Sequence, residues 1–265
     1  MRLYIIRHGE TDWNGAGRLQ GQTDTRLNEN GIRLARETAK GMENIPFDLC
    51  ITSPLARARQ TAEIVLGDRQ IPIQEEPRIR EISFGSWEGL GCRSHNYQIP
   101  VPIEEFDLFY TDPFRFTPAP DGETIEAVCA RTRQFLEELM AEPSYQDKTI
   151  LIATHGCALR ALLNSVYPDP TDFWHHRVPP NCAVSIVEVK YSAAVKDRIP
   201  VLAESDKIYY NPSQVEGRGL RAASCRCIIK SLTWDFQFFI MKLMSLAYPQ
   251  WTRGHTVLHH RFAIL

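Results

Sequence analysis

The sequence lacks the features of a membrane protein and of a general nucleic-acid binder. No run of about 18 uncharged apolar residues occurs, so no membrane span is expected. The charges nearly balance, with 30 Lys and Arg against 32 Asp and Glu and a net charge of -2, so no nucleic-acid partner is expected. The first residues hold one cation and too few apolar side chains for a signal peptide. These absences favour a cytoplasmic protein.

The 7 cysteines also lack the pattern of a disulfide framework. Their number is odd, and most are lone residues in apolar segments, at positions 50, 129, 157 and 182, as is typical of reduced thiols. Cys225 and Cys227 lie two positions apart, whereas common zinc sites need a second ligand pair at suitable spacing. His255, His259 and His260 could in principle supply that pair, but we expect no metal and no other cofactor.

Short apolar, β-prone runs alternate with helical patterns along the chain. The expected strands are residues 3–6, 49–51, 71–74, 149–153 and 183–189, with an edge strand at 200–204. The expected helices are residues 29–43, 53–66, 123–141 and 158–166. The second of these would start with Ser53 as N-cap and Pro54 in the first position. The alternation predicts an α/β fold, with a mostly parallel central sheet and helices on both faces.

Polar residues suited to phosphate chemistry lie at strand ends or helix starts, where open α/β sheets keep their ligand crevice. They are Arg7, His8, Arg57, Glu81, His155 and Gly156. Arginines neutralise phosphoryl oxygens that otherwise need Mg²⁺, an imidazole can attack phosphorus, and a carboxyl can protonate the leaving oxygen. The set therefore predicts a phosphoryl-transfer site without a metal.

A series of short motifs runs in one order through about residues 1–190. It consists of Arg7-His8-Gly9-Glu10-Thr11, Trp13-Asn14, Arg18-Leu19-Gln20-Gly21, Leu27-Asn28 with Gly31, Ser53-Pro54-Leu55 with Arg57-Ala58 and Gln60-Thr61-Ala62, Glu81, Phe84-Gly85 with Trp87-Glu88-Gly89, Gly122-Glu123, and His155-Gly156. In this order the motifs resemble those of the histidine phosphatase superfamily, in its phosphoglycerate mutase-like branch. The resemblance implies that family's three-layer fold and a phosphoryl-transfer enzyme.

The resemblance also implies a role for each matching residue. His8 would be the nucleophile that becomes phosphohistidine, and Glu81 would protonate the leaving alcohol and then activate water. The catalytic group would be completed by Arg7, Arg57 and His155. The phosphate would be bound by Arg7, Asn14, Gln20, Gly21, Arg57, His155 and Gly156. Arg59 is expected to be a solvated helix cation, and Glu88 a structural residue near the pocket.

The residues after the glutamate separate two branches of the resemblance. Mutases of the superfamily typically follow it with Arg-His-Tyr-Gly, whereas Ile82-Ser83-Phe84-Gly85 follow Glu81 here, which resembles the phosphatases. We therefore expect a metal-independent phosphomonoester hydrolase for a small phosphorylated metabolite, such as a sugar phosphate, a nucleotide or α-ribazole phosphate. The alternatives are a phosphoglycerate mutase-type transferase and an inactive module that binds a phosphorylated ligand.

Residues 90–122 are expected to form a lid-like insertion rich in prolines and aromatics. Its aromatic side chains would pack it onto the domain or, alternatively, line the pocket. Residues 85–122 carry two cations, Arg93 and Arg115, against six carboxylates, a formal charge of -4. An acidic lid would repel a second anionic group, so we expect a substrate with one phosphate and a neutral or apolar remainder.

The character of the chain changes near residue 213. Residues 1–213 are expected to form the phosphatase-like domain, and residues 214–265 a basic, partly amphipathic helical extension with a formal charge of +5. This extension would pack on the domain or across the interface of a homodimer. Attachment to a membrane surface and a poorly ordered tail are the alternatives.

Overall fold

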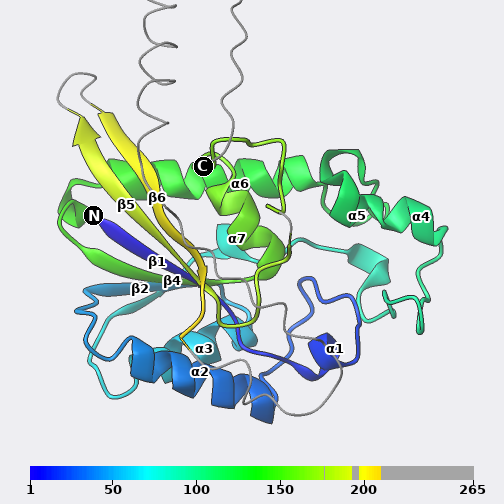
Figure 1. Cartoon of the computed structure of the whole chain (residues 1–265), viewed down its shortest axis with the longest axis horizontal. Coiled ribbons are helices and arrows are strands. Elements are labelled where there is room, and N and C mark those ends of the chain that lie inside the picture. Colours follow the sequence, from blue (N-terminus) through cyan, green and yellow to red (C-terminus); the bar gives the residue numbers. More distant parts are fainter. Residues whose placement is uncertain (176, 193–196, 210–265) are drawn as a thin grey trace, which may run out of the picture. The chain divides into compact units, whose positions relative to one another are not determined.

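The computed structural model describes residues 1–175, 177–192 and 197–209, and Figure 1 shows how their elements are arranged. These residues form one 6-stranded sheet with the strand order β3-β2-β4-β1-β5-β6. The strands are β1 (Arg2–Arg7), β2 (Leu49–Thr52), β3 (Ile73–Glu75), β4 (Thr149–Thr154), β5 (Val184–Ser192) and β6 (Asp197–Lys207). Strands β1 to β4 pair in parallel, and β5 and β6 pair antiparallel with their neighbours. The predicted α/β fold with a mostly parallel sheet is confirmed.

Helices cover both faces of the sheet (Figure 1). They are α2 (Glu29–Gly41) and α3 (Ala56–Leu66) on one face, and α6 (Ile125–Ala141) and α7 (Gly156–Leu163) on the other. Leu3 and Ile5 of β1 pack in one core with α6 and α7, whereas Tyr4 and Ile6 pack in a second core with α2 and α3. Successive side chains of a strand point to opposite faces, so an unbroken apolar strand needs a helical layer on each side.

The predicted start of α3 is wrong in one detail. The helix begins at Ala56, and its N-cap residue Leu55 makes no side-chain capping bond. Leu55 has extended backbone, with φ -69 and ψ 132, so the helix starts two residues later than predicted. Ser53 thus lies outside the helix, and its hydroxyl oxygen accepts a hydrogen bond of 3.3 Å from the Leu55 amide. The hydroxyl proton of Ser53 is free for another partner.

A third core combines Leu19 and Ile82 with apolar side chains between Phe84 and Trp174. The insertion contributes the short helices α4 (Ile103–Phe106) and α5 (Leu108–Thr111), and short 3₁₀ turns elsewhere in the chain and in the insertion span Pro77–Ile79, Gly85–Trp87, Pro113–Arg115 and Pro143–Tyr145. Phe106, Phe109 and Phe116 are buried and contact one another edge-on or stacked. Most aromatic side chains of the insertion therefore pack it onto the domain, while Phe109 and Tyr110 also line a cavity.

A buried ion pair joins α7 to β6. The guanidinium of Arg160 is 2.7 Å from the Asp206 carboxylate, and their side chains are 0% and 7% exposed. Arg160 also donates to the Arg177 carbonyl, and Arg177 itself pairs with Asp206 at 3.4 Å. This network holds the start of the chain segment from Arg177 to Asn181, which lies beside the site described below.

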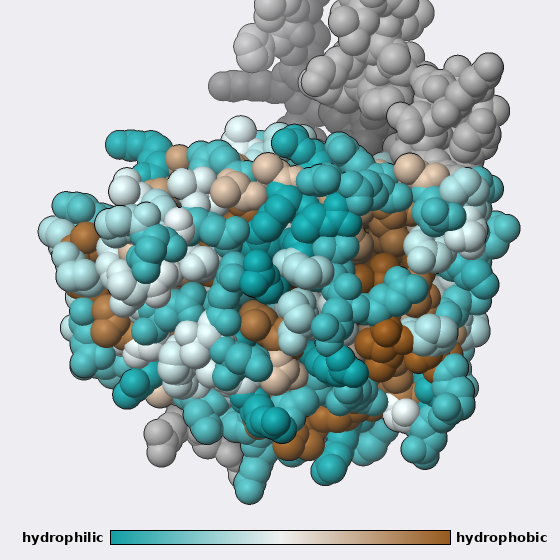
Figure 2. All heavy atoms as spheres, turned by 180° about the vertical axis from the view of Figure 1, so that it is seen from behind, coloured by the Kyte–Doolittle hydropathy of each residue, from teal (hydrophilic) through white to brown (hydrophobic). Residues whose placement is uncertain are grey.

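The surface of the described residues is mainly hydrophilic. On the face in Figure 2, teal side chains predominate and most hydrophobic ones are recessed between them. Val201 is the one large hydrophobic side chain classed as exposed in the described ranges. No helix within those ranges is both long and apolar enough to cross a membrane. The predicted extension at 214–265 lies outside the described residues.

Candidate active site

Strand register brings two histidines together. The last residue of β1, Arg7, is paired with Thr154, the last residue of β4, so the parallel strands end at the same level. The next residues along the chain, His8 and His155, consequently lie side by side, with ring centroids 5.2 Å apart. The same register places Ser53 beside them, because its amide donates to the Ala153 carbonyl of β4 at 2.9 Å.

The hydrogen bonds of His8 define which ring nitrogen is available. Its Nδ1 lies 2.6 Å from the Gly9 carbonyl oxygen, which can only accept, so Nδ1 carries the proton and Nε2 keeps its lone pair. Burial, followed by the charges of Arg57 and Arg7, holds the His8 pKa well below its ordinary value of 6.5. The imidazole is therefore neutral at pH 7, as a nucleophile must be.

His155 is completely buried and bonded through one ring nitrogen. Its Nε2 is 2.7 Å from the Ser53 hydroxyl, whereas its Nδ1 has no hydrogen-bond partner among the described residues. The Ser53 hydroxyl also accepts from the Leu55 amide, and if it donates its one proton to His155 Nε2, the ring proton lies on Nδ1. Burial, followed by the charges of Arg57 and Arg7, lowers the His155 pKa well below 6.5.

Two arginines flank the imidazoles. Arg57 is 0% exposed and donates to the Thr23 and Gly21 carbonyls at 2.9 and 2.6 Å, while its Nε has no partner in the described part of the chain. Burial lowers the Arg57 pKa to about 10, which still leaves it charged at pH 7. Arg7 ends β1 and donates to the Pro179 carbonyl. The unpaired, buried Nε–H of Arg57 beside two neutral imidazoles suits an anionic oxygen group.

Glu81 reaches the same edge of the sheet from the segment after Pro77–Ile79. Its carboxylate accepts from the amides of Ile82 at 3.0 Å, Ala158 at 2.9 Å and Cys157 at 3.2 Å. The last two amides belong to the first turn of α7, where unpaired N–H groups favour a negative group. The carboxylate is thus held beside the helix that follows His155.

An ion pair between Arg131 and Glu123 positions Glu81, and the sequence analysis did not single out Arg131. Arg131 of α6 donates to the carbonyls of Arg80 at 2.7 Å and Glu81 at 3.0 Å, and forms a two-point ion pair with Glu123. Glu123 in turn accepts from the Ser83 amide at 2.8 Å. No periodicity marks Arg131 in the helix pattern, so only the packing of α6 against residues 78–83 identifies it.

The predicted site residues fall into two layers around a cavity of about 380 Å³. The cavity is lined by Arg7, Asn14, Gln20, Glu81 and Gly156. His8, Gly21, Arg57 and His155 are not among its lining residues. Asn181, another lining residue that the sequence did not indicate, donates to the His8 carbonyl at 3.0 Å. Glu88 accepts from the Gln22 and Thr23 amides, in keeping with a structural role.

The charge of the insertion does not face the cavity as predicted. Among the charged residues of segment 85–122, Arg93 alone lines the cavity. The Asp121 carboxylate accepts from the Ser86 amide at 3.0 Å, and Asp112 pairs with Arg115. The net charge of -4 therefore says little about the pocket, because the fold turns the carboxylates elsewhere. The sequence argument assumed that these carboxylates face the substrate, and none of those in segment 85–122 lines the cavity.

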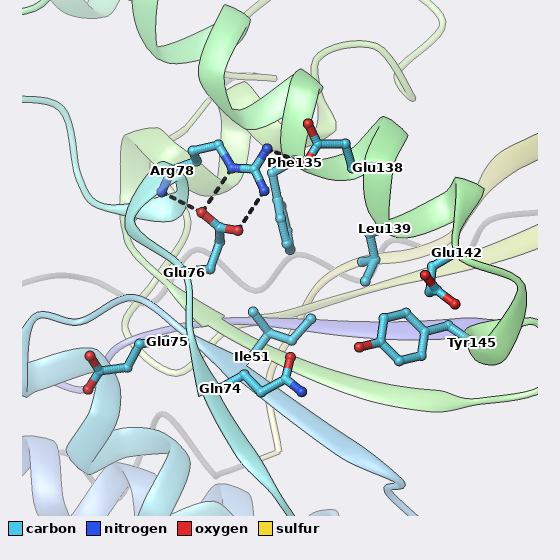
Figure 3. Close-up of a pocket in the computed structure, with 10 residues that line it drawn as sticks. All are labelled: Ile51, Gln74, Glu75, Glu76, Arg78, Phe135, Glu138, Leu139, Glu142 and Tyr145. Carbon is cyan, nitrogen blue, oxygen red and sulfur yellow. Dashed lines mark hydrogen bonds and ion pairs between the residues drawn. The ribbon is translucent and has the colours of Figure 1, made fainter.

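A second hollow, of about 230 Å³, lies between β3 and α6 (Figure 3). Its floor is apolar, with Ile51, Phe135 and Leu139, and its rim is acidic. Arg78, its one lining cation, is paired with Glu76 at 2.7 Å and with Glu138 at 2.6 Å. No predicted site residue lines this hollow, so the first cavity is the candidate active site.

The chain belongs to the histidine phosphatase superfamily, branch 1, whose family model matches residues 3–199. It is 34% identical over 183 residues to the adenosylcobalamin/alpha-ribazole phosphatase of Escherichia coli, covering 69% of this chain and 87% of that one. It is 33% identical to the uncharacterized phosphatase PhoE of Bacillus subtilis, covering 73% and 91%. Bacillus stearothermophilus YhfR is similar in structure, with a TM-score of 0.68, 31% identity, and coverage of 79% and 99%. The resemblance drawn from the motifs is thereby confirmed.

Proposed function

We propose that this protein hydrolyses phosphomonoesters of small metabolites through a phosphohistidine at His8. The observation that carries the proposal is the His8 ring itself: Nδ1 is bonded to the Gly9 carbonyl, Nε2 is free, and the ring is buried against His155. Family membership and the names of the phosphatase relatives support the same reaction. The relative from Escherichia coli makes α-ribazole phosphate one candidate, beside sugar phosphates and nucleotides.

The proposed reaction has two steps. His8 Nε2 attacks phosphorus, the bond between phosphorus and the ester oxygen breaks, and a protonated Glu81 gives its proton to the leaving alcohol. Water then attacks the phosphohistidine, Glu81 takes a proton from that water, and the bond between phosphorus and nitrogen breaks. Arg7, Arg57 and His155 Nδ1 would donate to the phosphoryl oxygens throughout, which is the charge neutralisation that a metal supplies elsewhere.

The decisive experiment is turnover of a panel of phosphomonoesters with EDTA present, using His8→Ala as the blank. We expect release of inorganic phosphate by the wild type, acid-labile phosphate on the quenched protein, and neither in the variant. Loss of activity in EDTA would contradict the metal-free step. A transferase would instead convert 3-phosphoglycerate to 2-phosphoglycerate without net release of phosphate, and an inactive binding module would bind esters without turnover.

A further inference from the structure

Two arginines that line the cavity have no part in the proposed reaction. Besides Arg7, the charged lining residues are Arg18, Arg93, Glu10 and Glu81. Both carboxylates are engaged: Glu10 accepts from the Asn28 side-chain amide at 2.9 Å, and Glu81 accepts from three backbone amides. Among the described residues, the Arg18 guanidinium donates only to the Gly89 carbonyl, at 3.3 Å.

Arg93 extends into the cavity wall with its charge unpaired. Within the described residues its guanidinium makes no hydrogen bond or ion pair. The aliphatic part of the Arg93 side chain lies over Gly17, where an added Cβ would come within 2.6 Å of Arg93 Cγ. Gly17 has φ +63, a backbone conformation that glycine adopts without strain. A side chain at this position would therefore displace Arg93 from the cavity wall.

Backbone pairing brings the chain segments that carry Arg18 and Arg93 side by side. Arg18 forms an antiparallel bridge with Gly91, and the Cys92 amide donates to the Gly17 carbonyl at 2.9 Å. The insertion is thus tied to the loop after α1 (Asp12–Gly15) just where each contributes a cation. Two guanidinium groups that line the same cavity can bind a carboxylate or a phosphate by charge-assisted hydrogen bonds.

Tyr110 connects this outer pair to the phosphate-binding side. Burial raises its pKa to about 12, and the charges of both Arg93 and Arg7 act on its phenol in the opposite direction. Tyr110 lines the same cavity as these two arginines. Phe109 and Trp174 supply the adjoining apolar surface, joined by a bond of 2.6 Å from Trp174 Nε1 to the Phe109 carbonyl.

We propose that the substrate carries a second anionic group, a carboxylate or a phosphate, which Arg93 and Arg18 bind while the reacting phosphate lies against Arg7 and His8. This inference rests on the proposed phosphatase function and narrows its substrate class. It reverses the expectation drawn from the net charge of the insertion.

Matched substrate pairs test this inference. 3-Phosphoglycerate differs from glycerol 3-phosphate by a carboxylate, and fructose 1,6-bisphosphate differs from fructose 6-phosphate by a phosphate. We expect the doubly anionic member of at least one pair to have about a tenfold higher kcat/KM, and the responding pair identifies which anion is bound. Equal turnover within both pairs, or a preference for the simpler ester, would overturn the inference.

Arg93→Gln tests the residue itself, with Arg115→Gln as its matched control. Both arginines are exposed cations of the insertion, but Arg115 does not line the cavity. We expect Arg93→Gln to lower kcat/KM for the doubly anionic ester about tenfold, mainly through KM, and to leave the simpler ester within about twofold. Arg115→Gln should change neither. An equal fall for both esters in Arg93→Gln would assign Arg93 a structural role and refute its part in recognition.

Failure of the inference can be told apart from failure of the reaction. Hydrolysis of the simpler esters without preference would refute only the second anion site. If no ester is hydrolysed, calorimetric titration of 3-phosphoglycerate and glycerol 3-phosphate into His8→Ala protein still decides the question. About tenfold tighter binding of the former, lost in His8→Ala with Arg93→Gln, supports the site. Equal affinities refute it.

Discussion

Replacing Ser53 by alanine removes one hydrogen bond from the centre of the site. The Ser53 hydroxyl lies 2.7 Å from His155 Nε2, and both residues are 0% exposed. In Ser53→Ala no water can readily reach the ring nitrogen, so Nε2 loses its partner and the ring is released from the orientation that directs Nδ1–H at the phosphoryl group. The change deletes one oxygen atom and should leave the backbone in place.

The magnitude follows from the cost of an unsatisfied buried group, about 1–3 kcal/mol. If that energy is lost mainly in the transition state, kcat/KM falls about 5- to 150-fold, since about 1.4 kcal/mol corresponds to a factor of ten. The fall should appear in kcat more than in KM, because His155 is proposed to donate most strongly when charge develops on the phosphoryl oxygens.

The assay compares Ser53→Ala with Ser86→Ala in steady-state hydrolysis and in ¹⁵N spectra of the histidines. Ser86 is exposed, and its hydroxyl bonds only to Asp121, at 3.1 Å, so its variant should match the wild type. In the wild type, His155 should carry its proton on Nδ1; in Ser53→Ala the two tautomers should become mixed. Activity within about twofold of wild type, together with an unchanged tautomer, would refute the reasoning about Ser53.

Three further predictions concern the charges of the domain. Arg57→Lys should lower kcat/KM about 100-fold or more in steady-state hydrolysis, because an ammonium cannot reproduce the guanidinium fork, whereas Arg59→Lys on the same helix should change it less than twofold. Asp206→Asn should lower the free energy of unfolding by about 3–5 kcal/mol in urea titrations, because it leaves the Arg160 charge buried and unpaired, and a loss below about 1 kcal/mol would contradict this. The His8 pKa is lowered from 6.5 in the folded protein, so below pH 6.5 the unfolded chain binds a proton that the folded protein does not. Stability should therefore fall as pH decreases from 6.5, and His8→Asn should reduce that slope by up to about 1.4 kcal/mol per pH unit in urea titrations at pH 7.5 and 5.5.

The order of strands and helices could be predicted because each element has a pattern of apolar and polar residues within its own few residues. The uncharged run before His155 predicted a central strand, and β4 does lie between β1 and β2. Since the carboxyl ends of parallel strands meet at one edge, the placement of His8 and His155 followed from their positions directly after two strands. The motif order indicated the superfamily, which the family match confirms.

Other features had no local signal or had a misleading one. A serine followed by proline is typical of a helix start, yet the Ser53 hydroxyl contacts His155, 102 positions away. Arg131 and Glu123 hold the Glu81 segment through contacts between α6 and the chain beneath it, which helical periodicity does not encode.

The sequence by itself determined the sheet, the two helical layers and the strand-end histidines, because periodicity, turn residues and strand direction act over a few residues. Only the tertiary structure decided which charges face the substrate. Net charge does not say which way the charged side chains of a segment point. The carboxylates of the insertion face backbone amides and solvent, as Asp121 does. Arg93, whose side chain lies over Gly17, lines the cavity. The path of the folded backbone, not the composition of the segment, gives the cavity wall its positive charge.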